Sequence, residues 1–174
     1  GTLTVTQALL TVKADDQTRL QGATNPPLTV SYSGFVNGQD TNILSGTPAL
    51  STSAETNSPA GPYPITVSQG TLSVTDTNYS LAFVEGTLNV VLPAAILNGP
   101  VDQVATNGDT VLFVVTVQGT EPLVYQWYFN QTNSLPGATN ATLVLSNVRP
   151  ADAGSYTLIL TTAYGGASGT ATLA

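Results

Sequence analysis

Short segments with strictly alternating side chains run the length of this sequence and limit it to an all-β fold. Leu10, Val12 and Ala14 lie on one side of a predicted strand, and Tyr125, Trp127 and Phe129 lie on one side of another. Between these segments, 16 Gly and 11 Pro residues mark turns. Thr occupies 28 positions, and its β-branched side chain favours pleated strands over helices. We therefore expect many short strands joined by tight turns.

The composition excludes several classes of function. The chain has no His, Cys or Met, which removes thiol and imidazole catalysis, His or Cys zinc sites, haem ligation by these residues and disulfides. Three Lys plus Arg cannot neutralise a phosphate backbone, so we expect no nucleic-acid partner. No apolar run approaches the roughly 20 residues of a membrane span, so we expect no membrane insertion of this segment. We also expect no cofactor.

The balance of charge and length indicates where such a chain works and how it is divided. Charged residues are 7% of the chain, against about 25% in ordinary globular proteins. A cysteine-free chain with three possible trypsin sites suits the outside of a cell, so we expect an extracellular or cell-surface location. At 174 residues, the chain is long enough for two small domains.

One phrase occurs twice, 85 residues apart. Residues 86–91 read Gly-Thr-Leu-Asn-Val-Val and close a β-rich segment, while the chain opens with Gly1, Thr2, Leu3, Thr4, Val5 and Thr6. The repetition predicts a tandem array. Residues 1–6 are then the terminal strand of a preceding repeat, or an exchanged strand that pairs with a sheet edge of a neighbouring subunit.

The second half carries a specific spacing: Gly119-x-x-Pro122, then Trp127, then Asp152-x-Gly154-x-Tyr156. This spacing resembles the immunoglobulin fold, and in particular the cysteine-free Ig-like domains of long secreted bacterial proteins, over about residues 95–174. The resemblance implies a β-sandwich over 101–174 with four core residues. Trp127 would pack between two sheets and Tyr156 would anchor a corner, while Val115 and Leu158 would replace the family's common disulfide cysteines.

The first half resembles the MBG domain, which is repeated in bacterial surface proteins, over about residues 7–91. The matching phrases include Leu10-Thr11-Val12-Lys13-Ala14-Asp15-Asp16, Tyr32-Ser33-Gly34-Phe35-Val36-Asn37-Gly38 and Gly61-Pro62-Tyr63-Pro64-Ile65. The sequence departs at Gln21-Gly22, where the family usually places Tyr-Gly. The resemblance implies a structural or adhesive module and supplies no catalytic residues. Residues 92–100, which contain two prolines, are expected to form a short, stiff linker between the domains.

Ten carboxylates invite a search for acid chemistry and for cations, but most lie in turn-like contexts. A small β-sandwich offers no deep cleft that would desolvate a general acid, so we expect no enzyme. The local clusters that could hold calcium involve Asp15, Asp16 and Asp76, and they lack EF-hand spacing. Lys13 alternates out of the predicted core, which argues against an isopeptide crosslink.

Two functional hypotheses remain. The first is a non-catalytic structural module of a bacterial extracellular repeat protein, such as a stalk, adhesin or filament subunit. It would act through β-sheet stacking and strand addition, with other copies or adjacent repeat domains as partners. The alternative is a carbohydrate-binding accessory module of a secreted polysaccharide-degrading enzyme. In either case a glycan or a host surface receptor is a further candidate partner, and the rings expected at the surface are Tyr63, Tyr128 and Tyr164.

Overall fold

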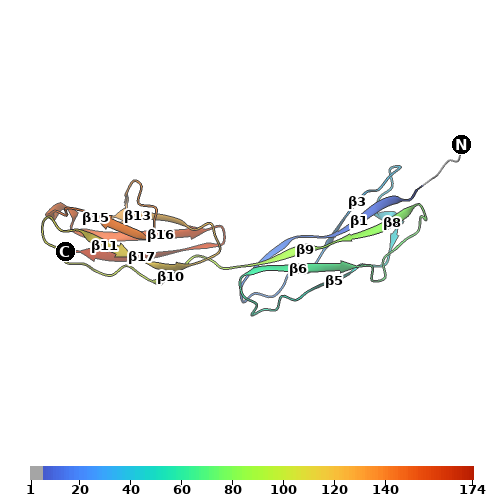
Figure 1. The fold of residues 1–174 in the computed structure, drawn as a ribbon, viewed down its shortest axis with the longest axis horizontal. Helices are drawn as coiled ribbons and strands as arrows, with labels where there is room; N and C mark the ends of the chain where they lie inside the picture. The colour runs from blue at the N-terminus through green and yellow to red at the C-terminus, as the bar shows by residue number, and fades with distance from the viewer. Residues whose placement is uncertain (1–5) are drawn as a thin grey trace. The chain divides into compact units, whose positions relative to one another are not determined.

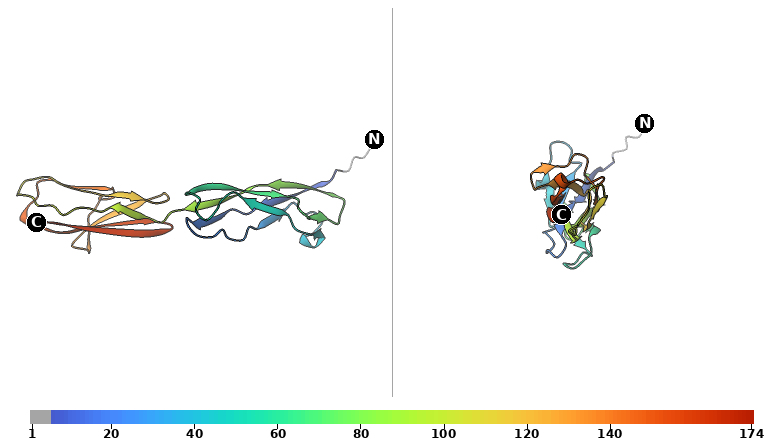
Figure 2. Two further views of the ribbon diagram at one scale, coloured as in Figure 1. Left: turned by 90° about the horizontal axis from the view of Figure 1, so that it is seen from below. Right: turned by 90° about the vertical axis from the view of Figure 1, so that its left-hand side faces the viewer.

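The computed structural model describes residues 6–174, and its regular structure is β-strand apart from two single-turn 3-10 helices (Figure 1). The chain divides after Val90 into two units, referred to as unit 1 and unit 2. In two further views, each unit consists of strands joined by loops (Figure 2). Among the described residues, no helix is long and apolar enough to cross a membrane.

Unit 1 is built from two main sheets. One has the strand order β3-β1-β8, the other has the order β2-β9-β6-β5, and β4 pairs with β7 in a small third sheet. The helix η1 spans Thr41–Ile43. The strands are β1 (Ala8–Ala14), β2 (Gln17–Leu20), β3 (Val30–Ser33), β4 (Leu44–Ser45), β5 (Ala49–Thr52), β6 (Gly61–Ser68), β7 (Ser73–Val74), β8 (Tyr79–Val84) and β9 (Gly86–Val91).

The core of unit 1 takes side chains from both main sheets. Leu10 and Val12 of β1 are fully buried, because every second residue of the strand points inward. Ile65 of β6 and Leu88 of β9 are fully buried in the same way. Each such side chain contributes about 1.5–3 kcal/mol through burial. The alternation in the sequence therefore predicts the core directly.

One buried charge ties two loops of unit 1 together. Arg19 of β2 is 6% exposed, and its Nε donates to Asn25 Oδ1 at 2.6 Å. The same guanidinium donates to the carbonyls of Leu20 and Glu55, while the amide of Asn25 donates to the carbonyl of Ala54 at 2.6 Å. Carbonyl and amide oxygens thus solvate the charge in place of water. The sequence analysis missed this residue, because a single Arg in a short polar strand carries no pattern.

Unit 2 contains a four-stranded sheet with the order β14-β13-β16-β17, together with the pairs β10-β12 and β11-β15. The helix η2 spans Pro150–Asp152. The strands are β10 (Ala95–Asn98), β11 (Val111–Val114), β12 (Thr116–Gln118), β13 (Val124–Phe129), β14 (Asn133–Ser134), β15 (Thr142–Leu145), β16 (Gly154–Thr162) and β17 (Gly165–Leu173).

The segment expected as a linker, 92–100, is partly a strand. Residues Ala95–Asn98 form β10, which pairs antiparallel with β12 and places Ile96 opposite Val117. Pro93 and Pro100 lie outside the strand, so neither removes a donor from the ladder. The prolines bound a strand rather than stiffen a tether, and the sheets of unit 2 begin before residue 101.

Aromatic rings fill the centre of unit 2. Trp127 is fully buried, and its Nε1 donates to the carbonyl of Asn140 at 2.9 Å. Phe113 stacks on Tyr156 with ring centroids 5.0 Å apart. Val115 and Leu158 lie in the same buried cluster at 5% and 0% exposure, and they fill the space with aliphatic carbon. All four expected core residues of this unit therefore lie together.

Tyr156 also makes the corner contact that the family resemblance implies. Its hydroxyl donates to the carbonyl of Asp152 at 2.8 Å, across the turn that leads into β16. Burial raises the pKa of this phenol, and the nearby carboxylate of Asp152 raises it further. A buried polar atom with a bonded partner fixes the path of the chain at this turn.

We expect Gly34→Ala to destabilise unit 1 by about 3 kcal/mol or more. Gly34 has a φ of +102°, and a Cβ there would lie 2.2 Å from the carbonyl oxygen of Leu9 in β1. The control is Gly22→Ala, where φ is +82° but nothing lies within 4 Å, so only about 1–2 kcal/mol should be lost. Urea unfolding followed by far-UV circular dichroism measures both, and equal losses would contradict the close approach.

We expect Tyr156→Phe to lower the unfolding free energy of unit 2 by about 1 kcal/mol, because it removes one buried hydrogen bond. The folded pKa of Tyr156 lies above the unfolded value, so its contribution is complete below about pH 10 and is lost as pH rises through the folded pKa. The variant should therefore lose less stability than the wild type above about pH 10.

Urea titrations from neutral to alkaline pH measure this difference. Tyr128→Phe, on a half-buried ring of the neighbouring strand β13, serves as the matched control and should retain the wild-type alkaline loss. If Tyr156→Phe lost as much unfolding free energy at alkaline pH as the wild type does, the hydrogen bond of Tyr156 to Asp152 would not be the source of that loss.

Candidate functional site

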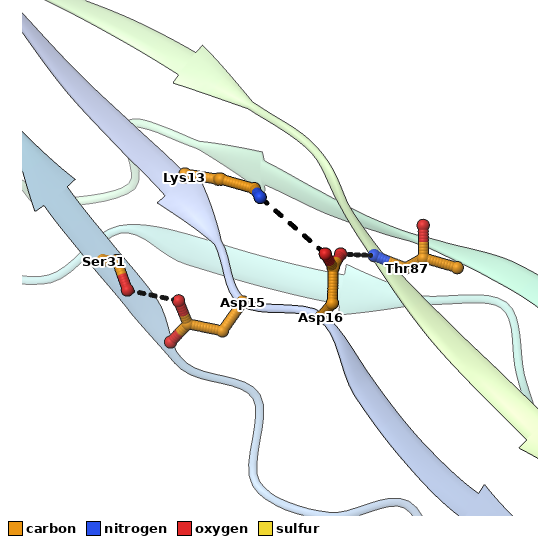
Figure 3. Close-up of polar contacts among 5 residues, drawn as sticks. All are labelled: Lys13, Asp15, Asp16, Ser31 and Thr87. Carbon is orange, nitrogen blue, oxygen red and sulfur yellow. Dashed lines mark hydrogen bonds and ion pairs between the residues drawn. The ribbon is translucent and has the colours of Figure 1, made fainter.

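The acidic candidates of unit 1 bind to different partners. Asp15 accepts hydrogen bonds from the hydroxyls of Thr29, at 2.7 Å, and Ser31. Asp16 turns the other way, accepts from the backbone N–H of Thr87 at 2.8 Å and lies 3.7 Å from Lys13 Nζ (Figure 3). Although adjacent in sequence, the two carboxylates therefore do not converge on one point.

Local hydrogen bonds also set the charge state of these groups. The hydroxyl of Ser31, followed by that of Thr29, lowers the pKa of Asp15 below its usual value. The side-chain amide of Gln39 and the N–H of Asn78 lower the pKa of Asp76 in the same way. A carboxyl group held ionised by nearby donors is a poor proton donor at neutral pH. These acids fasten turns to strands.

Strand register separates Asp76 from the other two acids. In the parallel ladder of β1 and β8, Ala8 lies opposite Tyr79 and Lys13 lies opposite Val84. Asp76 precedes this ladder and Asp15 follows it, and the five residue steps of the ladder alone span about 17 Å. Among residues 6–174, no three acidic, His or Cys side chains gather where they could hold a metal ion. The structure does not bring the calcium candidates together.

Tyr63 lies elsewhere than expected. The prolines around it predict an exposed turn, but Tyr63 is part of β6 and is half-buried on the same face as Ile65. Its hydroxyl donates to the carbonyl of Pro59 at 3.0 Å. Pro62 and Pro64 take the outward positions where β6 pairs only with β9, so the ring faces inward. Tyr63 therefore offers no free face for a sugar.

The other two tyrosines belong to unit 2 and are distant from each other. Tyr128 is half-buried in β13, opposite Thr157 of β16. Tyr164 is 38% exposed and lies in the turn after Thr162. The five residue steps from Thr157 to Thr162 span about 16 Å. Within unit 2, Tyr128 and Tyr164 therefore do not form a common platform.

Of the two copies of the repeated phrase, 1–6 and 86–91, the structure describes the second in full. Gly1–Val5 lie outside the described residues, and Thr6 is exposed and belongs to no strand. The second copy forms β9, where Leu88 and Val90 are 0% and 2% exposed. A Cβ at Gly86 would lie 2.4 Å from the carbonyl oxygen of Ala14. Three of the four identities between the copies therefore fall at buried positions, while of the two positions that differ Asn89 is exposed and Val91 is buried.

Each unit has a hollow on its surface. In unit 1, a groove of about 410 Å³ follows β8 and is lined by Tyr79, Leu81 and Phe83 together with Val74 and Asp76. In unit 2, a hollow of about 310 Å³ is lined by Ala105, Val148, Arg149, Pro150 and Leu173 among others. The sequence analysis missed both. The available signal for the groove was a six-residue run, Tyr79–Val84, without charge, Gly or Pro.

Both units hold an early segment parallel to a late one. In unit 1, β1 lies beside β8 over six positions, in a parallel ladder (Figure 1). In unit 2, Gln103 bridges in parallel to Leu173. Around it, Gln103 N donates to the Thr172 carbonyl at 2.8 Å, Ala174 N to the Gln103 carbonyl at 3.0 Å, and Ala105 N to the Ala174 carbonyl at 3.1 Å. This arrangement resists sliding of the two segments past each other.

Comparisons with solved structures agree with two β domains in tandem. Immunoglobulin domains 1–4 of Sidekick-1 match 98% of this chain and 49% of their own, at 12% identity and a TM-score of 0.64. An I-band fragment of titin, I67–I69, matches 93% of this chain over 63% of its own length, at 15% identity and a TM-score of 0.56. Extracellular domains 3–5 of Drosophila OTK match 92% of this chain over 59% of their own length, at 16% identity and a TM-score of 0.56. At these identities, the likeness shows the fold alone.

A comparison with curated proteins found no match. Comparison with protein families found two matching families, one in each half of the chain. The MBG domain family (YGX type) matches residues 10–89, and the immunoglobulin domain family matches residues 94–161. The chain therefore consists of an MBG domain followed by an immunoglobulin-like domain.

Proposed function

We propose that this chain is a non-catalytic, load-bearing module of a bacterial extracellular repeat protein, such as a stalk, adhesin or filament subunit. The observation that carries the proposal is the parallel pairing of an early segment with a late one in each unit. The low charge and the absence of cysteine support a place outside the cell. The family matches support a modular, non-enzymatic role.

The geometry of unit 1 favours resistance to tension. Pulling its ends apart draws β1 and β8 in opposite directions along their common axis, because the two strands are parallel. The bonds of a ladder loaded in this way share the force and break together. In a hairpin pulled open from one end, they break one after another. Force from the C-terminal side enters through β9, which pairs with β6 and β2 in the other main sheet, and it reaches β8 across Glu85, the single residue between the two strands.

Unit 2 repeats the principle with fewer bonds. Three hydrogen bonds of 2.8 to 3.1 Å join residues 103–105 to residues 172–174. Their net contribution to equilibrium stability is only about 1 kcal/mol each. Forced unfolding, however, is governed by the rate of unfolding, so bonds that must break first matter most. A small clamp of this kind raises mechanical resistance more than thermodynamic stability.

The carbohydrate-binding alternative draws no support from a specific arrangement. Tyr63 faces inward, and Tyr128 and Tyr164 lie at separate points of unit 2. Sugar recognition by stacking needs an exposed ring, usually with polar side chains beside it. The described residues supply one such ring at most, which does not favour carbohydrate binding.

The test is single-molecule force spectroscopy on the 174-residue chain held by its two ends. We expect two unfolding events, one for each unit. Ala105→Pro removes the N–H that bonds to Ala174, so the event of unit 2 should shift to lower force while that of unit 1 stays unchanged. Val104→Pro is the matched control, since Val104 is 87% exposed and lies next to the bonded residue.

The pulling direction provides a second control. Because the chain has no cysteine, a cysteine introduced at the exposed Ala153, just before β16, gives a unique handle at the open end of the hairpin, where Gly154 lies opposite Leu173. Pulling between this handle and the C-terminal end opens the β16–β17 hairpin bond by bond, and should require less force than pulling from the chain ends. Equal forces in the two directions, or no effect of Ala105→Pro, would overturn the proposal.

A further inference from the structure

Strand β8 is an open edge of unit 1. Within the described residues, its sheet has the order β3-β1-β8, so β8 has a partner on one side only. It is six residues long, whereas β2, β3 and β5, the other edge strands of the two main sheets, have four each. It contains none of the charges, prolines or glycines that blunt such edges. By these criteria β8 is the least protected edge of the unit.

The free backbone groups of β8 follow from its register with β1. Ala8 N donates to the carbonyl of Asn78 at 2.8 Å, and Ala8 lies opposite Tyr79. In a parallel ladder, alternate residues of a strand bond to one neighbour. Asn78, Ser80 and Ala82 therefore point their backbone groups towards β1. The N–H and carbonyl groups of Tyr79, Leu81 and Phe83 point towards the open side.

The same three residues line the groove along this edge. Tyr79 is 6% exposed, whereas Leu81 and Phe83 are only half-buried and border a space of about 410 Å³. An added strand would bond to the free backbone groups and place every second side chain over the groove. Apolar surface at Leu81 and Phe83 would then leave water, which favours binding at about 25 cal/mol per Å².

This chain carries a segment suited to that position. Residues 1–6 are uncharged, match β8 in length and alternate Leu3 and Val5 with Thr. The nearly identical phrase 86–91 is a strand in this protein, and it buries its Leu and Val at 0% and 2% exposure. Segment 1–6 therefore has the pattern of an inserted strand, with Leu3 and Val5 available for the groove.

The acceptor for the whole segment must belong to another molecule. Only Gln7 separates Thr6, the segment's last position, from Ala8, and the Gln7 side chain donates to the carbonyl of Thr77 at 2.7 Å. Two residues reach about 7 Å at most. The open side of β8 lies two strand spacings from β1, about 9.5 Å away. Segment 1–6 cannot pair along its full length with β8 of its own chain.

We propose that β8 of unit 1 accepts residues 1–6 of a second copy of this chain as an added strand. Repetition of this contact joins copies head to tail, because donor and acceptor are different surfaces. The proposal rests on the structural role proposed above and names its partner. The two proposals can fail independently of each other, because the force measurement probes pairing within one molecule and this contact lies between two molecules.

The experiment is amide hydrogen exchange by NMR on the 174-residue chain at low and high protein concentration. We expect the amides of Leu81 and Phe83 to slow by about tenfold or more at high concentration, as the second copy binds. The amides of Ser80 and Ala82 bond to β1 and should not change. Sedimentation velocity on the same samples should show association over the same range.

Variants in the donor segment precede the first strand and so leave the acceptor fold intact. Leu3→Asp combined with Val5→Asp should abolish both effects, whereas Thr2→Asp combined with Thr4→Asp adds the same charge on the other face and should retain them. A synthetic peptide of residues 1–6, added to the Leu3→Asp/Val5→Asp chain, should restore slow exchange at Leu81 and Phe83. Unchanged exchange at these amides, association that survives the Leu3 and Val5 substitutions, or protection at a different strand edge would each overturn the proposal.

Discussion

Burial of alternating aliphatic and aromatic side chains is the interaction on which both units depend. The chain has no cysteine for a disulfide, so noncovalent packing alone holds the sheets together. In unit 2, Val115 and Leu158 are 5% and 0% exposed beside Trp127, where a sandwich of this family commonly has a disulfide. Two aliphatic side chains fill that space and contribute about 1.5–3 kcal/mol each. The rings of Phe113, Tyr156 and Trp127 then fix the layer between the sheets.

Packing of this kind explains how much of the fold is readable from the sequence. Period-two alternation predicts the buried faces of β1 and β13, and the two family resemblances are confirmed at residues 10–89 and 94–161. The linker prediction was wrong for Ala95–Asn98, because two prolines mark the ends of a short strand as well as they mark a tether. Tyr63 was misplaced for a related reason, since proline is compatible with one side of a strand.

The functional features were harder to predict, because they depend on register between distant strands. Sequence places Asp15 and Asp16 side by side, yet the carboxylates turn to Ser31 and Thr87, which lie in other strands or at their starts. The open edge of β8 is invisible in the sequence, since a strand's neighbours are not local information. Arg19 shows the same limit, as its acceptors at Asn25 and Glu55 come from two loops.

Low charge connects the proposed load-bearing role to the open edge of β8. A strand between two neighbours needs no protection, and its outer face can carry Thr and Ser without cost to the ladder. At an edge, the same composition leaves free backbone groups beside apolar side chains, with no lysine to repel a further strand. A chain with 7% charged residues therefore gains strands that pack easily and loses the usual means of keeping edges apart. For the proposed joining of copies through β8, that loss becomes a means of assembly.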